Sequence, residues 1–261
     1  MLINIASYIA KTANKQGIVD YTIDENNTWH ILITRQMDVI KNRACDEFIA
    51  GLHLLNFPHN KIPQCPEVSV MLQQTTGWQL EPVEAIISFD RFFELLSQKR
   101  FPAATFIRRE EDLDYIKEPD IFHEIFGHCP LLTNQAYADF VYAYGKLGLK
   151  ATAEERVLLA RLFWFTIEFG LIQTPQGLRA YGGGILSSPK ETVYSLESQE
   201  PTRLPFNVIN ALQTNYHIDK IQPVYFIINH FDQLYELIHM DLIRLIREVQ
   251  YQNTIIPRHP C

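Results

Sequence analysis

Apolar residues recur at three- and four-residue steps along most of the chain, which is the spacing of the buried face of an α-helix. This periodicity predicts helices over residues 29–55, 67–76, 89–98, 134–149, 153–169 and 222–250. Strand signals are fewer and shorter, and they cover residues 85–88, 104–107 and 178–181. The pattern predicts a mainly α fold with small peripheral β-strands, and no internal repeat or low-complexity tract interrupts it.

Length and composition suit one globular domain. With 261 residues, 47% of them hydrophobic, the chain can bury a large core, and no linker rich in proline, glycine or serine divides it. We therefore expect a single domain over residues 1–261. The 23 basic and 30 acidic residues give a net charge of −7, which argues against the basic surface that binds nucleic acid. The expected ligand is a small molecule.

The N-terminal residues lack both the basic start of a signal peptide and the long apolar run of a membrane span. We therefore expect a cytoplasmic protein with no membrane partner. Cys45, Cys65, Cys129 and Cys261 are far apart and form no CxxC pair. This spacing favours reduced thiols over a disulfide framework or a structural zinc site.

Two histidines, His123 and His128, lie in the segment PDIFHEIFGHCP of residues 119–130. The segment is similar to the His-Glu-x-x-His pattern of zinc hydrolases, in which ligands at i and i+4 face one metal from a regular helix. Here the histidines are five residues apart, so a regular helix would turn them about 140° away from each other. Gly127 and Pro130 are typical of a helix end. The sequence therefore predicts His123 in the helix and His128 at its frayed end.

Glu168 stands alone among bulky hydrophobic residues near the end of the predicted helix 153–169. A buried carboxylate needs a partner, because burial of an unpaired charge is costly. From Glu168 alone, a core arginine and a metal ion both remain open as that partner. Together with His123 and His128, the metal is favoured. Two imidazoles and one carboxylate leave coordination positions open, which is typical of non-haem Fe(II) centres that activate dioxygen.

Three blocks of the chain, residues 118–130, 164–170 and 180–188, together resemble the pterin-dependent aromatic amino acid hydroxylases, and most closely their bacterial phenylalanine-hydroxylating branch. Shorter matches extend upstream to Thr28-Trp29 and downstream to Ile255-Pro257, so the resemblance covers most of the chain. It implies the catalytic-domain fold of that family and hydroxylation of L-phenylalanine to L-tyrosine with Fe(II), a tetrahydropterin and O2. Alternatives are tryptophan or tyrosine as the substrate, or a zinc-dependent hydrolase.

The resemblance also implies roles for individual residues. His123, His128 and Glu168 match the metal ligands and form the catalytic centre. The substrate-binding positions are Arg108, Asp120, Trp164, Gly184 and Ser187, where Asp120 holds Arg108 or caps the His123 helix and Ser187 hydrogen-bonds the first metal histidine. The pterin positions are Ile86, Phe92 and Glu124, with Phe93 as the alternative to Phe92. Arg109 is expected to be a solvated neighbour of Arg108.

The resemblance bears on the organisation of the protein as well. Animal members of the family carry an N-terminal regulatory domain and a C-terminal tetramerising helix. This chain is expected to be a catalytic domain without the regulatory domain and without a long tetramerisation tail. A monomer and a dimer both remain open. The expected functional partners are L-phenylalanine and the enzymes that recycle the oxidised pterin.

Overall fold

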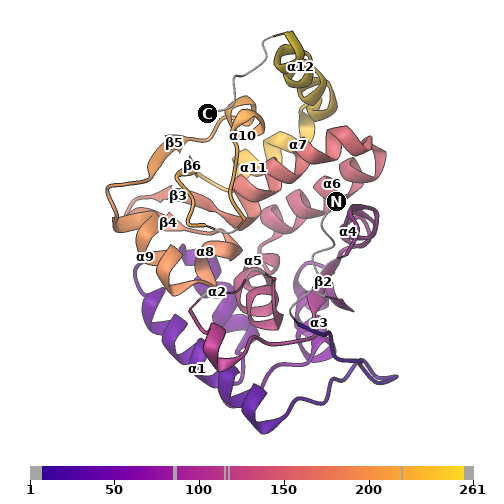
Figure 1. The fold of residues 1–261 in the computed structure, drawn as a ribbon, viewed down its shortest axis with the longest axis vertical. Coiled ribbons are helices and arrows are strands. Elements are labelled where there is room, and N and C mark those ends of the chain that lie inside the picture. The colour runs from indigo at the N-terminus through magenta and orange to yellow at the C-terminus, as the bar shows by residue number, and fades with distance from the viewer. Residues whose placement is uncertain (1–7, 85–86, 115, 117, 219, 256–261) are drawn as a thin grey trace.

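The structure, a computed structural model, describes residues 8–255 apart from residues 85, 86, 115, 117 and 219 (Figure 1). Helices dominate this part of the chain, and six short strands form two small sheets. The longer helices are α1 (Ile23–Val39), α2 (Asp46–Leu55), α3 (Cys65–Thr75), α4 (Phe89–Leu96), α6 (Gln135–Lys150), α7 (Ala153–Phe163), α9 (Pro189–Glu197), α11 (Asp232–His239) and α12 (Leu242–Ile255). The shorter ones are α5 (Cys129–Leu132), α8 (Gly183–Leu186), α10 (Val208–Gln213) and a 3-10 turn at Glu110–Asp112. This architecture agrees with the predicted mainly α fold.

The predicted helix over residues 29–55 is wrong, because the chain forms two helices there. Helix α1 begins at a capping box in which Thr22 accepts from the Glu25 amide, and it ends at Val39. Asn42 then adopts a left-handed conformation with φ 58°, which a continuous helix does not accommodate. The Cys45 amide donates to the Ala180 carbonyl at 3.0 Å, so the break is tied to the end of strand β4 (Gly177–Ala180).

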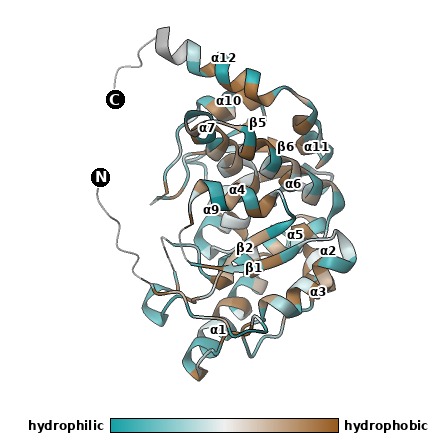
Figure 2. Ribbon diagram, turned by 90° about the vertical axis from the view of Figure 1, so that its right-hand side faces the viewer, coloured by the Kyte–Doolittle hydropathy of each residue, from teal (hydrophilic) through white to brown (hydrophobic). Residues whose placement is uncertain are grey.

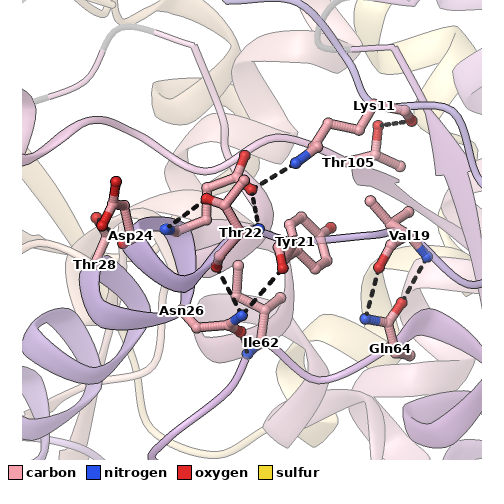
Figure 3. A network of polar contacts seen from close by, with 11 residues as sticks. Lys11, Val19, Tyr21, Thr22, Asp24, Asn26, Thr28, Ile62, Gln64 and Thr105 are labelled. Atoms are coloured by element: carbon pink, nitrogen blue, oxygen red, sulfur yellow. Dashed lines mark hydrogen bonds and ion pairs between the residues drawn. The ribbon is translucent and has the colours of Figure 1, made fainter.

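The segment before α1 is fixed to two distant parts of the fold (Figure 3). The Lys11 ammonium lies 2.5 Å from Glu25 of α1, and the Lys11 carbonyl accepts from the Thr105 hydroxyl at 2.7 Å. Farther along, the amide and carbonyl of Val19 pair with the Gln64 side chain at 2.9 and 3.1 Å. These bonds hold the N-terminal segment against α1, against the start of α3 and against Thr105, three residues before Arg108.

The smaller sheet pairs β1 (Gln79–Val83) in parallel with β2 (Arg100–Ala104), and α4 connects the two strands. Strand β1 therefore precedes the predicted strand over residues 85–88, of which 85 and 86 lie outside the described residues. Ser88 is no strand residue, since its hydroxyl accepts from the Arg91 amide and begins α4. The strand predicted over residues 104–107 is displaced as well, because pairing ends where Val83 meets Ala104.

The larger sheet has the strand order β4-β3-β6-β5, with β3 (Gly170–Thr174), β5 (Thr202–Pro205) and β6 (Val224–Ile228). Strand β4 matches the predicted strand near residues 178–181, and it pairs antiparallel with β3. Strand β6 lies between β3 and β5 in parallel register. The predicted helix over residues 222–250 is therefore wrong: it consists of β6 followed by α11 and α12. Asp241 accepts from the Arg244 amide and begins the last helix.

One hydrophobic core joins the helices to both sheets, and hydrophobic and hydrophilic residues alternate along the helices, α12 included (Figure 2). Its largest fully buried side chains include Trp29, Trp78 and Tyr181. Cys45, Cys65 and Cys129 are buried free thiols, as predicted, and Cys261 lies outside the described residues. Among the helices that the structure describes, none combines the length and the apolar composition needed to cross a membrane.

Close packing of α2 on α5 leads to the first prediction. A Cβ at Gly51 would lie 2.1 Å from the Pro130 carbonyl oxygen, so α2 and α5 touch through backbone. We expect Gly51→Ala to lower the free energy of unfolding by about 2 kcal/mol or more, although alanine has the higher helix propensity. Chemical denaturation measures the change. At the exposed neighbour Ala50, the reverse substitution Ala50→Gly should cost only about 1 kcal/mol. A stabilised Gly51→Ala variant would contradict the packing argument.

Candidate active site

Residues His123–His128 form a π-helical turn that continues directly into α5. In a π-helix the backbone bonds join residues five apart, so the side chains at i and i+5 lie on the same face. The prediction that the helix ends near Gly127 and frees His128 is wrong, because the wider turn aligns the two histidines without a break. Pro130 lies in the first turn of α5, where a missing amide proton is tolerated.

Glu168 also lies on a π-helical segment, Trp164–Glu168, which extends α7. The Phe169 amide donates to the Trp164 carbonyl at 2.8 Å, a bond that spans five residues, and the chain then enters β3 at Gly170. Trp164 and Glu168 line one cavity. Both segments that carry candidate ligands thus have the wide helical turn.

The three side chains converge on one point. His123 Nε2 lies 3.1 Å from His128 Nε2 and 3.6 Å from Glu168 Oε2, and His128 Nε2 lies 3.3 Å from Glu168 Oε1. One ligand atom from each residue lies within 4.8 Å of the others, and among the described residues no other such group of three occurs. The donor set is the one that the sequence predicted for a metal site.

A hydrogen-bond chain fixes the tautomer of His123. Ser187 Oγ donates to the Gly183 carbonyl at 2.8 Å, so its only proton is committed. The same oxygen lies 2.9 Å from His123 Nδ1 and therefore accepts the proton that this nitrogen carries. Nε2 of His123 is left with a lone pair directed toward the other two side chains. The predicted contact between Ser187 and the first histidine is thus present, and it orients a metal ligand.

The electrostatics of the three side chains suit a cation. Burial lowers the pKa of His123 to about 4, although the Glu168 carboxylate opposes this, so the imidazole is neutral near pH 7. Burial alone would raise the pKa of Glu168, but His128, His123 and the Gly184 amide hold it below its usual value. An ionised carboxylate and two imidazole nitrogens then face one another. A divalent metal ion would satisfy all three, and this arrangement fits Fe(II).

The triple glycine of residues 182–184 packs against the Glu168 backbone and carboxylate. A Cβ at Gly182 would lie 2.2 Å from the Glu168 carbonyl oxygen, and a Cβ at Gly184 would lie 3.0 Å from Glu168 Oε2. A larger residue at Gly182 would clash with the Glu168 backbone, and one at Gly184 would press on the Glu168 carboxylate. Gly184 lines the cavity, as the sequence predicted, and its amide also contributes to the charge state of Glu168.

A cavity of about 510 Å³ opens beside the three ligands, and Arg108, Trp164, Gly184 and Ser187 contribute to its walls. Asp120 is fully buried behind Arg108 and accepts from its Nε and Nη2 at 2.7 and 2.9 Å. Asp120 also accepts from the His123 amide at 3.0 Å, so it both holds the arginine and caps the histidine helix. Burial alone would raise the pKa of Asp120, but Arg108 holds it below its usual value.

The described residues expected to bind a pterin do not gather around the cavity as the expected substrate-binding residues do. Phe92 is partly buried and contacts Phe163 edge-on with 5.2 Å between ring centroids, whereas Phe93 is fully buried in the core. Of the two neighbours, only Phe92 keeps an accessible edge. Burial, together with the nearby carboxylates of Glu168 and Asp120, raises the pKa of Glu124 well above its usual value. Neither Phe92 nor Glu124 lines the 510 Å³ cavity, and Ile86 lies outside the described residues.

Comparison with known proteins identifies the family. The family model of the biopterin-dependent aromatic amino acid hydroxylases matches residues 2–254. The chain belongs to this family. The resemblance stated from its motifs is therefore confirmed, and the expected dependence on a pterin is the property that defines the family.

Several of the similar proteins are bacterial phenylalanine hydroxylases. A phenylalanine-4-hydroxylase of Pseudomonas aeruginosa is 53% identical over 253 residues, which cover 97% of this chain and 96% of the relative. The apo structure of the cold-active phenylalanine hydroxylase of Colwellia psychrerythraea matches with a TM-score of 0.92 at 50% identity, over 94% of this chain and 95% of that one. The Chromobacterium violaceum phenylalanine hydroxylase with bound oxidised Fe(III) matches with a TM-score of 0.87 at 40% identity, over 92% and 90%. The predicted fold is confirmed.

Other residues of this hydroxylase line the cavity without having been singled out from the sequence. Glu191 of α9 and the residues His217 and Gln222 before β6 belong to this group. A buried glutamate in an amphipathic helix and a glutamine in a loop carry no local signal of a binding site. Their positions depend on contacts with Trp164 and Tyr225 that are distant in the sequence.

The hydrogen bond from His123 to Ser187 leads to the second prediction. Ser187→Ala removes the acceptor that fixes the His123 tautomer, so we expect the affinity for Fe(II) to fall about 10- to 100-fold. Anaerobic titration with Fe(II) measures this change. Ser188→Ala is the matched control, because the Ser188 hydroxyl accepts from the Glu191 amide and not from a metal ligand. Equal affinity in the wild type and Ser187→Ala would show that the bond does not orient the ligand.

Proposed function

We propose that this hydroxylase converts L-phenylalanine to L-tyrosine with Fe(II) at His123, His128 and Glu168, a tetrahydropterin and O2. The observation that carries the proposal is the opening of the three-ligand site into a cavity that also presents a buried, carboxylate-held arginine. Such a cavity suits an amino acid whose ring lies near the metal and whose carboxylate meets the guanidinium. The names of the bacterial relatives support phenylalanine as that amino acid.

In this proposal Arg108 binds the substrate carboxylate. Its Nε and Nη2 are engaged by Asp120, so Nη1 is the nitrogen that remains for the ligand. Burial alone would lower the pKa of Arg108, but Asp120 raises it above its usual value, so the guanidinium is charged at every working pH. Trp164 forms part of the aromatic wall of the cavity, and its ring also stacks on Phe169 and Tyr216 with centroid distances of 4.7 and 4.5 Å. Gly184 and Ser187 complete the side near the metal.

The iron and the pterin, when bound, supply the activation of dioxygen and the reducing equivalents. The protein holds the ligands, orients the substrate and excludes bulk water. For the pterin, Phe92 is proposed as the stacking ring, with Ile86 and Glu124 as further contacts. Burial favours a protonated Glu124, which is then a hydrogen-bond donor toward a ligand.

Several expectations stay predictions of this proposal. They are a single catalytic domain, a monomeric or dimeric state, a place in the cytoplasm and functional dependence on enzymes that recycle the oxidised pterin. The last follows from the chemistry, because each turnover consumes a reduced pterin. Tryptophan is the first alternative substrate to test. Its two-ring system requires a wider cavity than phenylalanine does, so its turnover reports on the width of the binding site.

The third prediction is the activity itself. With Fe(II), O2 and a synthetic tetrahydropterin, the chain should form tyrosine from L-phenylalanine, and omission of any one component should abolish the product. Glu168→Ala removes the carboxylate ligand and should lower turnover by at least about 1,000-fold. Chromatography of the amino acids measures the product. Iron-loaded wild type that forms no tyrosine, but does hydroxylate tryptophan, would replace the proposed substrate within the same family.

The fourth prediction separates two adjacent arginines. Arg108 is 4% exposed and paired with Asp120, whereas Arg109 is solvent-exposed and contacts Glu111 at 3.4 Å. Arg108→Lys keeps the charge but loses the planar fork, so we expect KM for L-phenylalanine to rise about 10- to 100-fold. Arg109→Lys is the matched control and should leave KM within about twofold. Initial rates over a range of phenylalanine concentrations measure both variants. Equal KM values would remove Arg108 from the carboxylate site.

A further inference from the structure

A single buried amide, that of Gln222, joins two walls of the cavity. Gln222 is 1% exposed and lies directly before β6. Its Oε1 accepts from the Trp164 indole Nε1 at 3.1 Å and from the His217 amide at 3.3 Å. Its Nε2 donates to the carbonyls of His217 and Lys220 at 2.6 and 2.9 Å. The side chain therefore uses its full capacity of two donated and two accepted hydrogen bonds.

The partners of Gln222 also fix which end of the amide is oxygen. Two N–H donors, from Trp164 and His217, meet one end, and two carbonyl acceptors meet the other. A reversed amide would set donors against donors and acceptors against acceptors, and each mismatch in a buried site is costly. The indole of Trp164 consequently has one preferred acceptor and one preferred orientation.

The residues that Gln222 joins lie on different elements but face the same cavity. Trp164 comes from the π-helical extension of α7. His217, Ile218, Lys220 and Ile221 come from the segment before β6 and line the same cavity. The name 217–221 segment refers to these four residues, because residue 219 lies outside the described part of the chain. Gln222 thus sets the separation between the aromatic wall and this segment.

The backbone of Gln222 is itself held by Glu191. Its backbone amide donates to Glu191 Oε1 at 3.2 Å, and the Tyr225 hydroxyl donates to the same oxygen. Glu191 lies on α9 and Tyr225 on β6, so the larger sheet and a helix together hold the amide in place. The metal ligands take no part in these bonds. Loss of the Gln222 side chain would therefore remove the hydrogen bonds that hold the Trp164 indole and the 217–221 segment, without removing any bond of the three-ligand site.

We propose that Gln222 is a positioning residue for substrate selection: it holds Trp164 and the 217–221 segment at the separation that accepts a one-ring amino acid and disfavours a two-ring one. The proposal rests on the proposed function, because it concerns how the same cavity selects among aromatic amino acids. Gln222 contributes to KM and to selectivity, and the chemical step does not depend on it.

The variant Gln222→Met keeps the length of the side chain and removes all four hydrogen bonds. We expect KM for L-phenylalanine to rise about tenfold, with kcat within about twofold, since one to two buried hydrogen bonds correspond to about a tenfold change in binding. The ratio of kcat/KM for phenylalanine to that for tryptophan should fall several-fold. A drop in kcat at unchanged KM and unchanged selectivity would overturn the proposal.

Gln36 provides a matched control. It is also 1% exposed, and its Nε2 donates to the Leu186 carbonyl and the Thr192 hydroxyl at 2.7 and 3.1 Å, but it does not line the cavity. Gln36→Met removes a buried amide of the same kind and should leave KM and selectivity unchanged. An equal rise in KM in Gln36→Met would mean that general loosening, and not the contact with Trp164, explains the effect, and would overturn the proposal.

A double-mutant cycle with Trp164→Phe tests whether the effect passes through the indole. Trp164→Phe removes only the N–H donor and part of the ring, and it leaves the bonds of Gln222 to the 217–221 segment in place. If Gln222 acts through Trp164, the rise in KM for the double variant is smaller than the product of the two single rises. Independent, multiplicative rises would overturn the proposal. Trp164→Phe alone provides the test of the indole bond if Gln222→Met fails to fold.

A spectroscopic measurement separates this proposal from the proposed function. The 261-residue chain contains three tryptophans, so its 15N-labelled form has three indole N–H signals, and Trp164→Phe assigns one of them. Gln222→Met should shift the Trp164 signal and leave those of Trp29 and Trp78 in place. If the wild type formed no tyrosine, the proposed function would fail, but this shift would still show that Gln222 holds Trp164. An unmoved Trp164 signal would overturn the positioning role, whatever the substrate.

Discussion

The structure depends on one constraint: three side chains with lone pairs, His123, His128 and Glu168, are held within 4.8 Å of one another. Facing lone pairs repel unless a proton or a cation lies between them, so the surrounding fold has to keep these groups in place. It does so with two π-helical turns, which bring residues five apart onto one face. Helices α2, α5 and α8 pack around these turns and stabilise a backbone geometry that is rare in isolation.

Asp120 connects this centre to the binding of substrate. One carboxylate accepts from the Arg108 guanidinium, from the Arg108 amide and from the His123 amide, all between 2.7 and 3.0 Å. The distance between the metal ligand and the proposed carboxylate anchor is therefore set by a single buried group. Removal of Asp120 would leave Arg108 buried and unpaired and would also uncap the helix of His123. Metal binding and substrate orientation thus share one support.

The sequence predicted which residues come together at the site better than it predicted the backbone geometry that brings them together. The spacing of His123, His128 and the isolated Glu168 singled out three side chains that the structure brings together, but an α-turn and a π-turn use the same residues, so the helix end predicted at Gly127 was wrong. Residues 222–250 misled in another way: strand β6 is apolar on both faces, and its run mimics helical periodicity until its pairing with β3 and β5 is known. No role in the cavity could be assigned to Gln222 from the sequence, because its partner Trp164 lies 58 residues earlier.

The two sides of the cavity are built by different physical means. On the metal side, glycine backbones pack directly against Glu168, and a side chain added there would press on its backbone or its carboxylate. On the opposite side, Trp164 and the 217–221 segment are held by hydrogen bonds to one amide, and side chains there can change at the cost of a few such bonds. Close packing therefore preserves the reaction centre, while the polar contacts of Gln222 adjust the shape of the binding site. Because the two sides are held separately, substitutions on the Trp164 side can change which aromatic ring the cavity accepts without altering the metal chemistry.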